Sequence, residues 1–126
     1  MDNKKRNILN WVLAALVAFI FVGSATMKLM GGSDVLKMAE GFGFDKTTFT
    51  LIAILELTSV VLFLIPRTGV LGTLLLAAYM GGAIVTHLSH GDSIVTVCII
   101  QAFVWIVAIM RFPELTNRFS GKAQAA

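Results

Sequence analysis

The sequence predicts an all-α protein, a four-transmembrane-helix antiparallel bundle with a short amphipathic surface helix between helices one and two. Three observations support this. Hydrophobic residues make up 57% of the chain and the mean hydropathy is +0.87, both above the values typical of soluble domains. Four apolar runs fill most of the 126 residues, which leaves room for a single transmembrane domain, 1–126. Basic residues also collect at alternate ends of these runs.

Glycine, proline and charged residues separate the four runs. The first ends at Gly31, where flexible backbone favours a helix end, and the second ends at Pro66, which cannot continue a helix. The third ends near His90, and Arg111 and Pro113 close the fourth. Short turns between later runs favour antiparallel neighbours. The predicted spans are residues 8–30, 48–65, 69–89 and 94–111.

The first connection, residues 33–47, is the only one long enough to have a structure of its own. Val35, Leu36, Ala39 and Phe42 fall near helical spacing between charged residues, which favours a short amphipathic helix on the membrane surface. An irregular loop with a few buried side chains is the alternative.

Lysine and arginine are unevenly divided between the two sets of helix ends, and cytoplasmic flanks usually retain the excess. Only Lys37 and Lys46, with Lys28 at a helix end, belong to one side. The other side has the larger set: Lys4, Lys5, Arg6, Arg67, Arg111, Arg118 and Lys122. The sequence therefore predicts a multi-pass protein of the inner membrane with both termini in the cytoplasm.

Several function classes fit poorly. The net charge of +3 comes largely from basic residues beside apolar runs, not from a basic surface with interleaved aromatic residues, so no nucleic-acid partner is expected. Cys98 is the only cysteine, which excludes an internal disulfide and a dithiol redox motif. His87 and His90 lie on one helix end and match no metal-ligand signature, so no metal site is expected. No phosphate-binding loop or nucleophile elbow is present, and no catalytic residue is assigned.

Four polar side chains from different helices are expected at a similar depth. Glu56 lies about 12 Å below the predicted start of the second span, where an acid costs at least about 2.5 kcal/mol on insertion scales. Because the helices alternate in direction, Lys28, His87 and Gln101 come to the same half of the bundle. They are the candidate ligand-binding residues.

Each of these residues also has a structural interpretation. Glu56 could join two helices as a protonated acid, and Lys28 could extend its ammonium to the head groups. His87 could bond to Thr86 or a neighbouring carbonyl. The remaining polar residues are expected to form helix-to-helix hydrogen bonds: Gln101, Ser24 and Ser59.

Two pairs of small residues lie four apart in the third span. Ala77 with Gly81, and Ala78 with Gly82, form overlapping ridges on which helices can approach closely. These helix-packing residues could serve internal packing or self-association.

The layout resembles the DoxX-like family. The resemblance rests on four short spans, the Lys28-Leu29 pair, the Glu56-Leu57 pair followed by Leu-Ile-Pro at 64–66, and His87 near the end of the third span. It implies a four-helix membrane bundle whose relatives include a subunit associated with a terminal quinol oxidase and thiosulfate:quinone oxidoreductase. Many relatives have no assigned activity, and only Lys28, Glu56 and His87 match transferable positions.

Three functions remain as hypotheses. The first is an accessory subunit of a membrane redox system, not an enzyme on its own, that binds a small quinone-like ligand in a polar pocket in the outer half of the bundle. The second is a structural or assembly protein without a ligand, which docks on a redox partner or a second copy. The third is a proton-coupled transporter using Glu56 and His87, which four spans would support only as a dimer.

Overall fold

The computed structural model describes residues 2–122, and the described part of the chain is all-helical. Its elements are α1 (Asn3–Met30), α2 (Ser33–Gly41), α3 (Lys46–Leu64), the short 3-10 helix η1 (Pro66–Thr68), α4 (Gly69–Ser89), α5 (Val95–Arg111) and α6 (Pro113–Phe119). The long helices follow the predicted spans within a few residues. The all-α prediction is therefore confirmed, as is the helix between the first two long helices.

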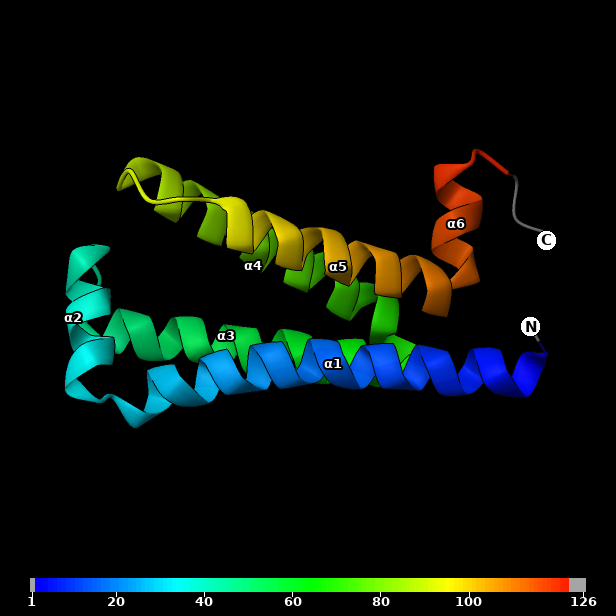
Figure 1. Ribbon diagram of the computed structural model, residues 1–126, viewed down its shortest axis with the longest axis horizontal. Helices are drawn as coiled ribbons and strands as arrows, with labels where there is room; N and C mark the ends of the chain where they lie inside the picture. Colours follow the sequence, from blue (N-terminus) through cyan, green and yellow to red (C-terminus); the bar gives the residue numbers. More distant parts are fainter. Residues whose placement is uncertain (1, 123–126) are drawn as a thin grey trace.

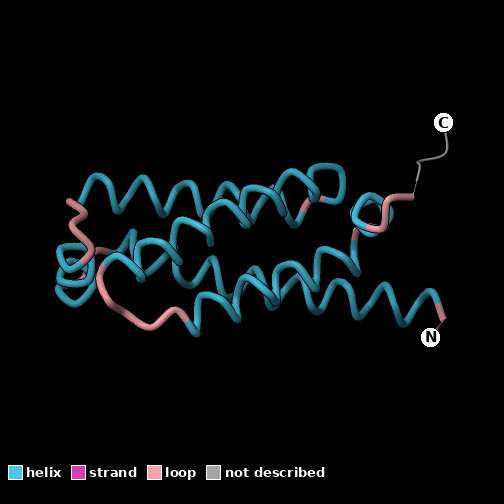
Figure 2. Tube along the Cα trace, turned by 90° about the horizontal axis from the view of Figure 1, so that it is seen from above, coloured by secondary structure: helices cyan, strands magenta, loops and turns pink. Residues whose placement is uncertain are grey.

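The four long helices form two antiparallel pairs. Figure 1 shows α1 beside α3 and α4 beside α5, with the two pairs close together near the chain termini and diverging toward α2. The α3–α4 turn lies at the same end as the termini, whereas α2 crosses the opposite end. In Figure 2, α2 and α6 are viewed nearly along their axes while the long helices run across the picture. The bundle therefore has a closed end and an open end.

The described helices carry enough apolar length to cross a bilayer. Three segments qualify alone, namely α1, α3 and the segment Pro66–Ser89, and α5 with α6 qualifies as a fourth only as a pair bent by 106°. Their outer faces are apolar: Phe19 is 79% exposed and Val85 64%. Apolar side chains facing outward on every long helix suit a surrounding of lipid.

Side-chain caps set where two long helices begin. The Asp2 carboxylate accepts a hydrogen bond from the Lys5 amide at 2.8 Å, so α1 starts several residues before the predicted apolar run. Asp45 caps α3 in the same way, with its carboxylate 2.7 Å from the Thr48 amide. Gly31 ends α1 with a φ of 64°, which glycine adopts without strain.

The tightest packing lies at the closed end. A Cβ at Gly72 would overlap the backbone of Phe63, and one at Gly69 would overlap the ring of Phe112. Phe63 and Phe112 themselves meet edge to face with their centroids 6.2 Å apart. Gly72 therefore lets α3 and α4 approach closely beside η1, and Gly69 leaves room for the Phe112 ring at the break between α5 and α6.

Helix α6 was not predicted from the sequence. Pro113 was interpreted only as the end of the fourth run. Proline also suits the first turn of a new helix, because the N–H groups there have no partner within the helix and the missing N–H of proline costs no hydrogen bond. Leu115 is buried against the bundle, and Trp105 packs on Phe119 with centroids 5.6 Å apart. These contacts hold α6 across the closed end.

Candidate functional site

A cavity of about 440 Å³ lies at the open end of the bundle, where the helix pairs diverge. Its wall takes side chains from all four long helices and from α2, whose Met38 and the following Phe42 lie over it. The lining is mostly apolar, and three of the four candidate residues belong to it: Lys28, Glu56 and His87. This size and composition are those of sites for small organic ligands.

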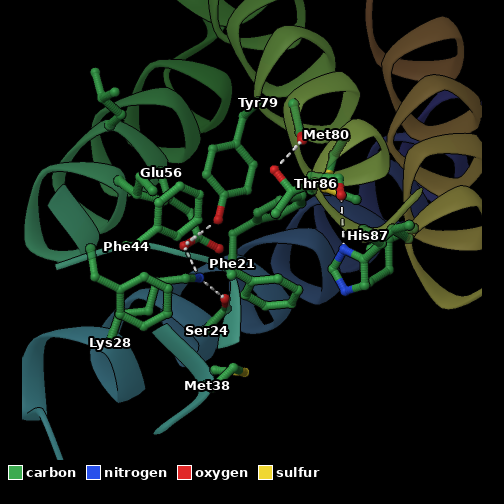
Figure 3. A pocket seen from close by; sticks show the side chains of 18 of the residues that line it. Phe21, Ser24, Lys28, Met38, Phe44, Glu56, Tyr79, Met80, Thr86 and His87 are labelled. Atoms are coloured by element: carbon green, nitrogen blue, oxygen red, sulfur yellow. Dashed lines mark hydrogen bonds and ion pairs between the residues drawn. The ribbon is translucent and has the colours of Figure 1, made fainter. Parts of the chain in front are cut away.

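Lys28 and Glu56 form an ion pair between α1 and α3. The Lys28 ammonium lies 2.8 Å from Glu56 Oε2, and the two side chains are 11% and 1% exposed. The same ammonium donates to the Ser24 hydroxyl, one turn earlier on α1, at 2.6 Å (Figure 3). Lys28 is therefore directed into the bundle toward Glu56, so the alternative of a Lys28 that snorkels to the head groups does not describe this geometry.

Tyr79 completes this polar network and was missed at the sequence level. Its hydroxyl donates to Glu56 Oε2 at 3.1 Å, and its ring lies 5.8 Å from the Lys28 ammonium. The Phe21 ring meets Tyr79 edge-on at 6.2 Å and fixes its orientation. Tyr79 is the single tyrosine of the sequence and stands in an apolar run, where a buried hydroxyl requires a partner. This need for a hydrogen-bond partner is the feature of the sequence that could have identified Tyr79 as a site residue.

His87 lies in the cavity wall apart from this network (Figure 3). Its Nδ1 is 2.8 Å from the Ala83 carbonyl, which can only accept, so Nδ1 carries a hydrogen. In the neutral ring Nε2 is then an acceptor, and no hydrogen bond from residues 2–122 reaches it. Phe42 packs on the imidazole with centroids 5.1 Å apart. The alternative of a carbonyl-bonded histidine thus holds for one ring nitrogen and leaves the other available.

Gln101 does not line the cavity. Its side-chain amide donates to the Ala77 carbonyl of α4 at 3.3 Å, which is the helix-to-helix bond expected of it. The expectation was wrong for the two serines, because both bond within their own helices. Ser24 accepts from Lys28, and Ser59 donates to the Leu55 carbonyl at 2.7 Å. A serine hydroxyl reaches the carbonyl one turn earlier more easily than a neighbouring helix.

The small-residue ridges of α4 face open space within the described chain. A Cβ at Gly81 or Gly82 would meet no atom within 4 Å, whereas Ala78 and Gly82 line the cavity. Close helix packing inside the chain instead uses the glycines at the start of α4, Gly69 and Gly72. Self-association through the predicted ridge stays a prediction.

The site combines an apolar chamber with a few unused hydrogen-bonding positions. An ammonium has three N–H groups, and two of those on Lys28 are engaged. Within residues 2–122 no hydrogen bond reaches Glu56 Oε1, and no group of three His, Cys, Asp or Glu side chains could hold a metal ion. The Lys28–Glu56 pair and His87 can therefore offer one further donor and two acceptors to a ligand.

Comparison with known proteins identifies the family. The sequence profile of the DoxX-like family matches residues 12–110, which covers most of the chain and includes Lys28, Glu56 and His87. No curated protein and no solved structure matches the chain. The chain belongs to the DoxX-like family, and with its long apolar helices it is a membrane protein.

Proposed function

We propose that this DoxX-like membrane protein binds a small, neutral, amphipathic ligand of the quinone class beside Glu56 and serves as an accessory subunit of a membrane redox system. The observation that supports this proposal most directly is the cavity of about 440 Å³, in which Lys28, Glu56 and His87 belong to a mostly apolar wall. A quinone ring suits such a chamber because it is flat, apolar over most of its surface and polar at two opposite oxygens.

The proposed orientation in the membrane follows from the ends of the bundle. We propose four spans with both termini on the cytoplasmic side of the inner membrane. Support comes from the closed end, where both termini and η1 lie together and Arg67 and Arg111 add to the basic residues that begin α1. The cavity then belongs to the outer half of the bilayer, with α2 at its surface.

The unused hydrogen-bonding positions match both oxidation states of a quinone. An oxidised ring presents carbonyl oxygens, which can accept the remaining N–H of Lys28. A reduced ring presents hydroxyls, which can donate to Glu56 Oε1 or to His87 Nε2. Because Figure 3 separates His87 from the Lys28–Glu56 pair, one ligand could meet a polar group at each end of its ring.

A histidine comparison tests the proposal with a control from the same helix end. We expect His87→Ala to weaken binding of a short-chain ubiquinone analogue to the purified protein by about tenfold, the value of one good hydrogen bond. His90→Ala is the control, because His90 also packs on Phe42, with centroids 5.6 Å apart, but lies outside the cavity wall. Equal affinities in the wild type and the His87 variant would refute the proposal.

A structural role is the second candidate, and one observation favours it specifically. Ser24 and Tyr79 add hydrogen bonds to the Lys28–Glu56 pair within the chain, so the pair can join α1, α3 and α4 without any ligand. In that case the ridge at Gly81, which does not line the cavity, would dock on a partner or a second copy.

Substituting the ridge separates the two candidates. A Cβ at Gly81 would meet no atom of the described chain within 4 Å, so we expect Gly81→Leu to leave the fold intact, which circular dichroism checks, but to dissociate a detergent-stable complex. If the purified protein is monomeric and brings no partner with it, the assembly role is excluded. If the complex dissociates while quinone affinity is unchanged, docking and ligand binding are separate properties of the same protein.

A further inference from the structure

A second cavity lies at the opposite end of the molecule, in the corner between the start of α1 and the break between α5 and α6. Its volume is about 590 Å³. Its lining is polar and basic: Asn3, Lys4, Arg6, Asn7, Asn10, Met110, Arg111 and Pro113. Three of these residues are cationic and none is acidic, so this cavity differs in chemistry from the one beside Glu56.

The polar face of α1 in this corner is unusual for the start of a membrane helix. Asn3, Asn7 and Asn10 recur at helical spacing, so amide side chains occupy the face that meets α5. The Asn10 amide donates to the Met110 carbonyl at 3.3 Å, which ties the two helices together at the floor of the cavity. Arg6 donates to the Asn3 side chain at 3.2 Å.

Arg111 is the fixed cation of this site. Its Nη1 and Nη2 atoms donate to the carbonyls of Phe63 and Leu64, at 2.8 and 3.2 Å, at the end of α3. Its guanidinium carbon lies 5.1 Å from the Trp11 ring centroid and 4.9 Å from that of Phe112. A guanidinium has five N–H groups, so three remain after these bonds, on a planar group that the rings hold in place.

We propose that this corner binds an anionic phosphate group, the head group of a membrane phospholipid. A fixed guanidinium with two exposed cations and amide donors is the combination that recognises phosphate oxygens. Pro113, the first residue of α6, lines the corner at the point where α6 bends by 106° away from α5. In the proposed topology this end faces the cytoplasmic leaflet, where anionic lipids concentrate.

Native mass spectrometry of the purified full-length chain tests the site. The probes are phosphatidylglycerol and phosphatidylcholine with identical acyl chains. We expect one phosphatidylglycerol to be retained in preference to phosphatidylcholine, and Lys4→Ala/Arg6→Ala to weaken its binding about 30-fold for two lost charges. Arg111 is left intact, because its substitution would also loosen the end of α3.

A matched double variant separates a built site from general attraction to positive charge. Lys5→Ala/Arg118→Ala also removes two exposed cations near this end, but neither residue lines the cavity. We expect it to change the affinity by less than about threefold. Equal weakening by both double variants, equal retention of the two lipids, or unchanged binding in Lys4→Ala/Arg6→Ala would each overturn the proposal.

Inorganic phosphate distinguishes the source of the phosphate group. If millimolar phosphate leaves the phosphatidylglycerol bound, the occupant is the lipid, because the acyl chains and glycerol contribute to its affinity. If phosphate displaces the lipid, the corner is a site for free phosphate and the lipid assignment is wrong.

Discussion

Replacing Lys28 or Glu56 alone should lower the free energy of unfolding by unequal amounts. Glu56 is 1% exposed, and its short side chain cannot reach the membrane surface from the middle of α3. Lys28 lies two residues before the end of α1, so its long side chain can turn outward if the acid is lost. Lys28→Met should therefore harm stability more than Glu56→Gln.

The magnitudes follow from the geometry. At 2.8 Å and an effective dielectric constant of 20, the attraction within the pair is about 6 kcal/mol before desolvation is counted. Lys28→Met leaves a buried acid without its cation, which should lower the free energy of unfolding by about 3–5 kcal/mol. Glu56→Gln keeps the shape and loses charged hydrogen bonds, so about 1.5–3 kcal/mol is expected.

Unfolding in mixed detergent and SDS micelles measures both variants and the double variant. The double variant should cost little more than Glu56→Gln alone, because no unpaired acid remains in it. The argument would be refuted if Glu56→Gln were the more damaging single change. It would also be refuted if the double variant cost the sum of the two single ones, since the partners would then act independently.

The same unfolding measurement checks two further predictions at the closed end. Arg111→Ala should lower stability by about 1.5–3 kcal/mol for each of its bonds to the Phe63 and Leu64 carbonyls, and Arg111→Lys should recover only part of the loss because an ammonium lacks the planar fork. Gly72→Ala should cost at least about 1–3 kcal/mol because its methyl group overlaps backbone, whereas Gly81→Ala meets open space and should be neutral or slightly stabilising; equal effects would contradict the packing described here.

The long helices were predictable because their signals are local. A run of about 20 apolar residues requires no knowledge of its neighbours, and Gly31 and Pro66 mark helix ends through their own backbone preferences. The start of α1 was missed because the Asp2 cap lets the helix begin in a polar segment, several residues before the apolar run that marks the span. Helix α6 was missed because proline is compatible with both the end and the start of a helix.

The sequence predicts how deep in the bundle each candidate residue lies, and only this part of the candidate site was predictable. Depth placed Lys28, Glu56 and His87 in one half of the bundle, and all three line one cavity. Rotation of a helix about its axis is not set by depth, which explains why Gln101 at a similar level faces α4 instead. Tyr79 required knowledge of how α4 packs on α3, because a tyrosine in an apolar run can place its hydroxyl in several directions.

The internal pairing of Lys28 with Glu56 also limits what the cavity can accept. The two groups have opposite formal charges 2.8 Å apart, so together they add no net charge to the chamber. A charged ligand would lose its hydration there without gaining an unpaired counter-charge, which is costly in an apolar surrounding. A neutral ring loses less and can still use the free positions on Lys28, Glu56 and His87. Under the function proposed above, the ion pair therefore has a structural and a binding role at once: it gives a buried acid its cation, and by doing so it makes the cavity selective for uncharged ligands.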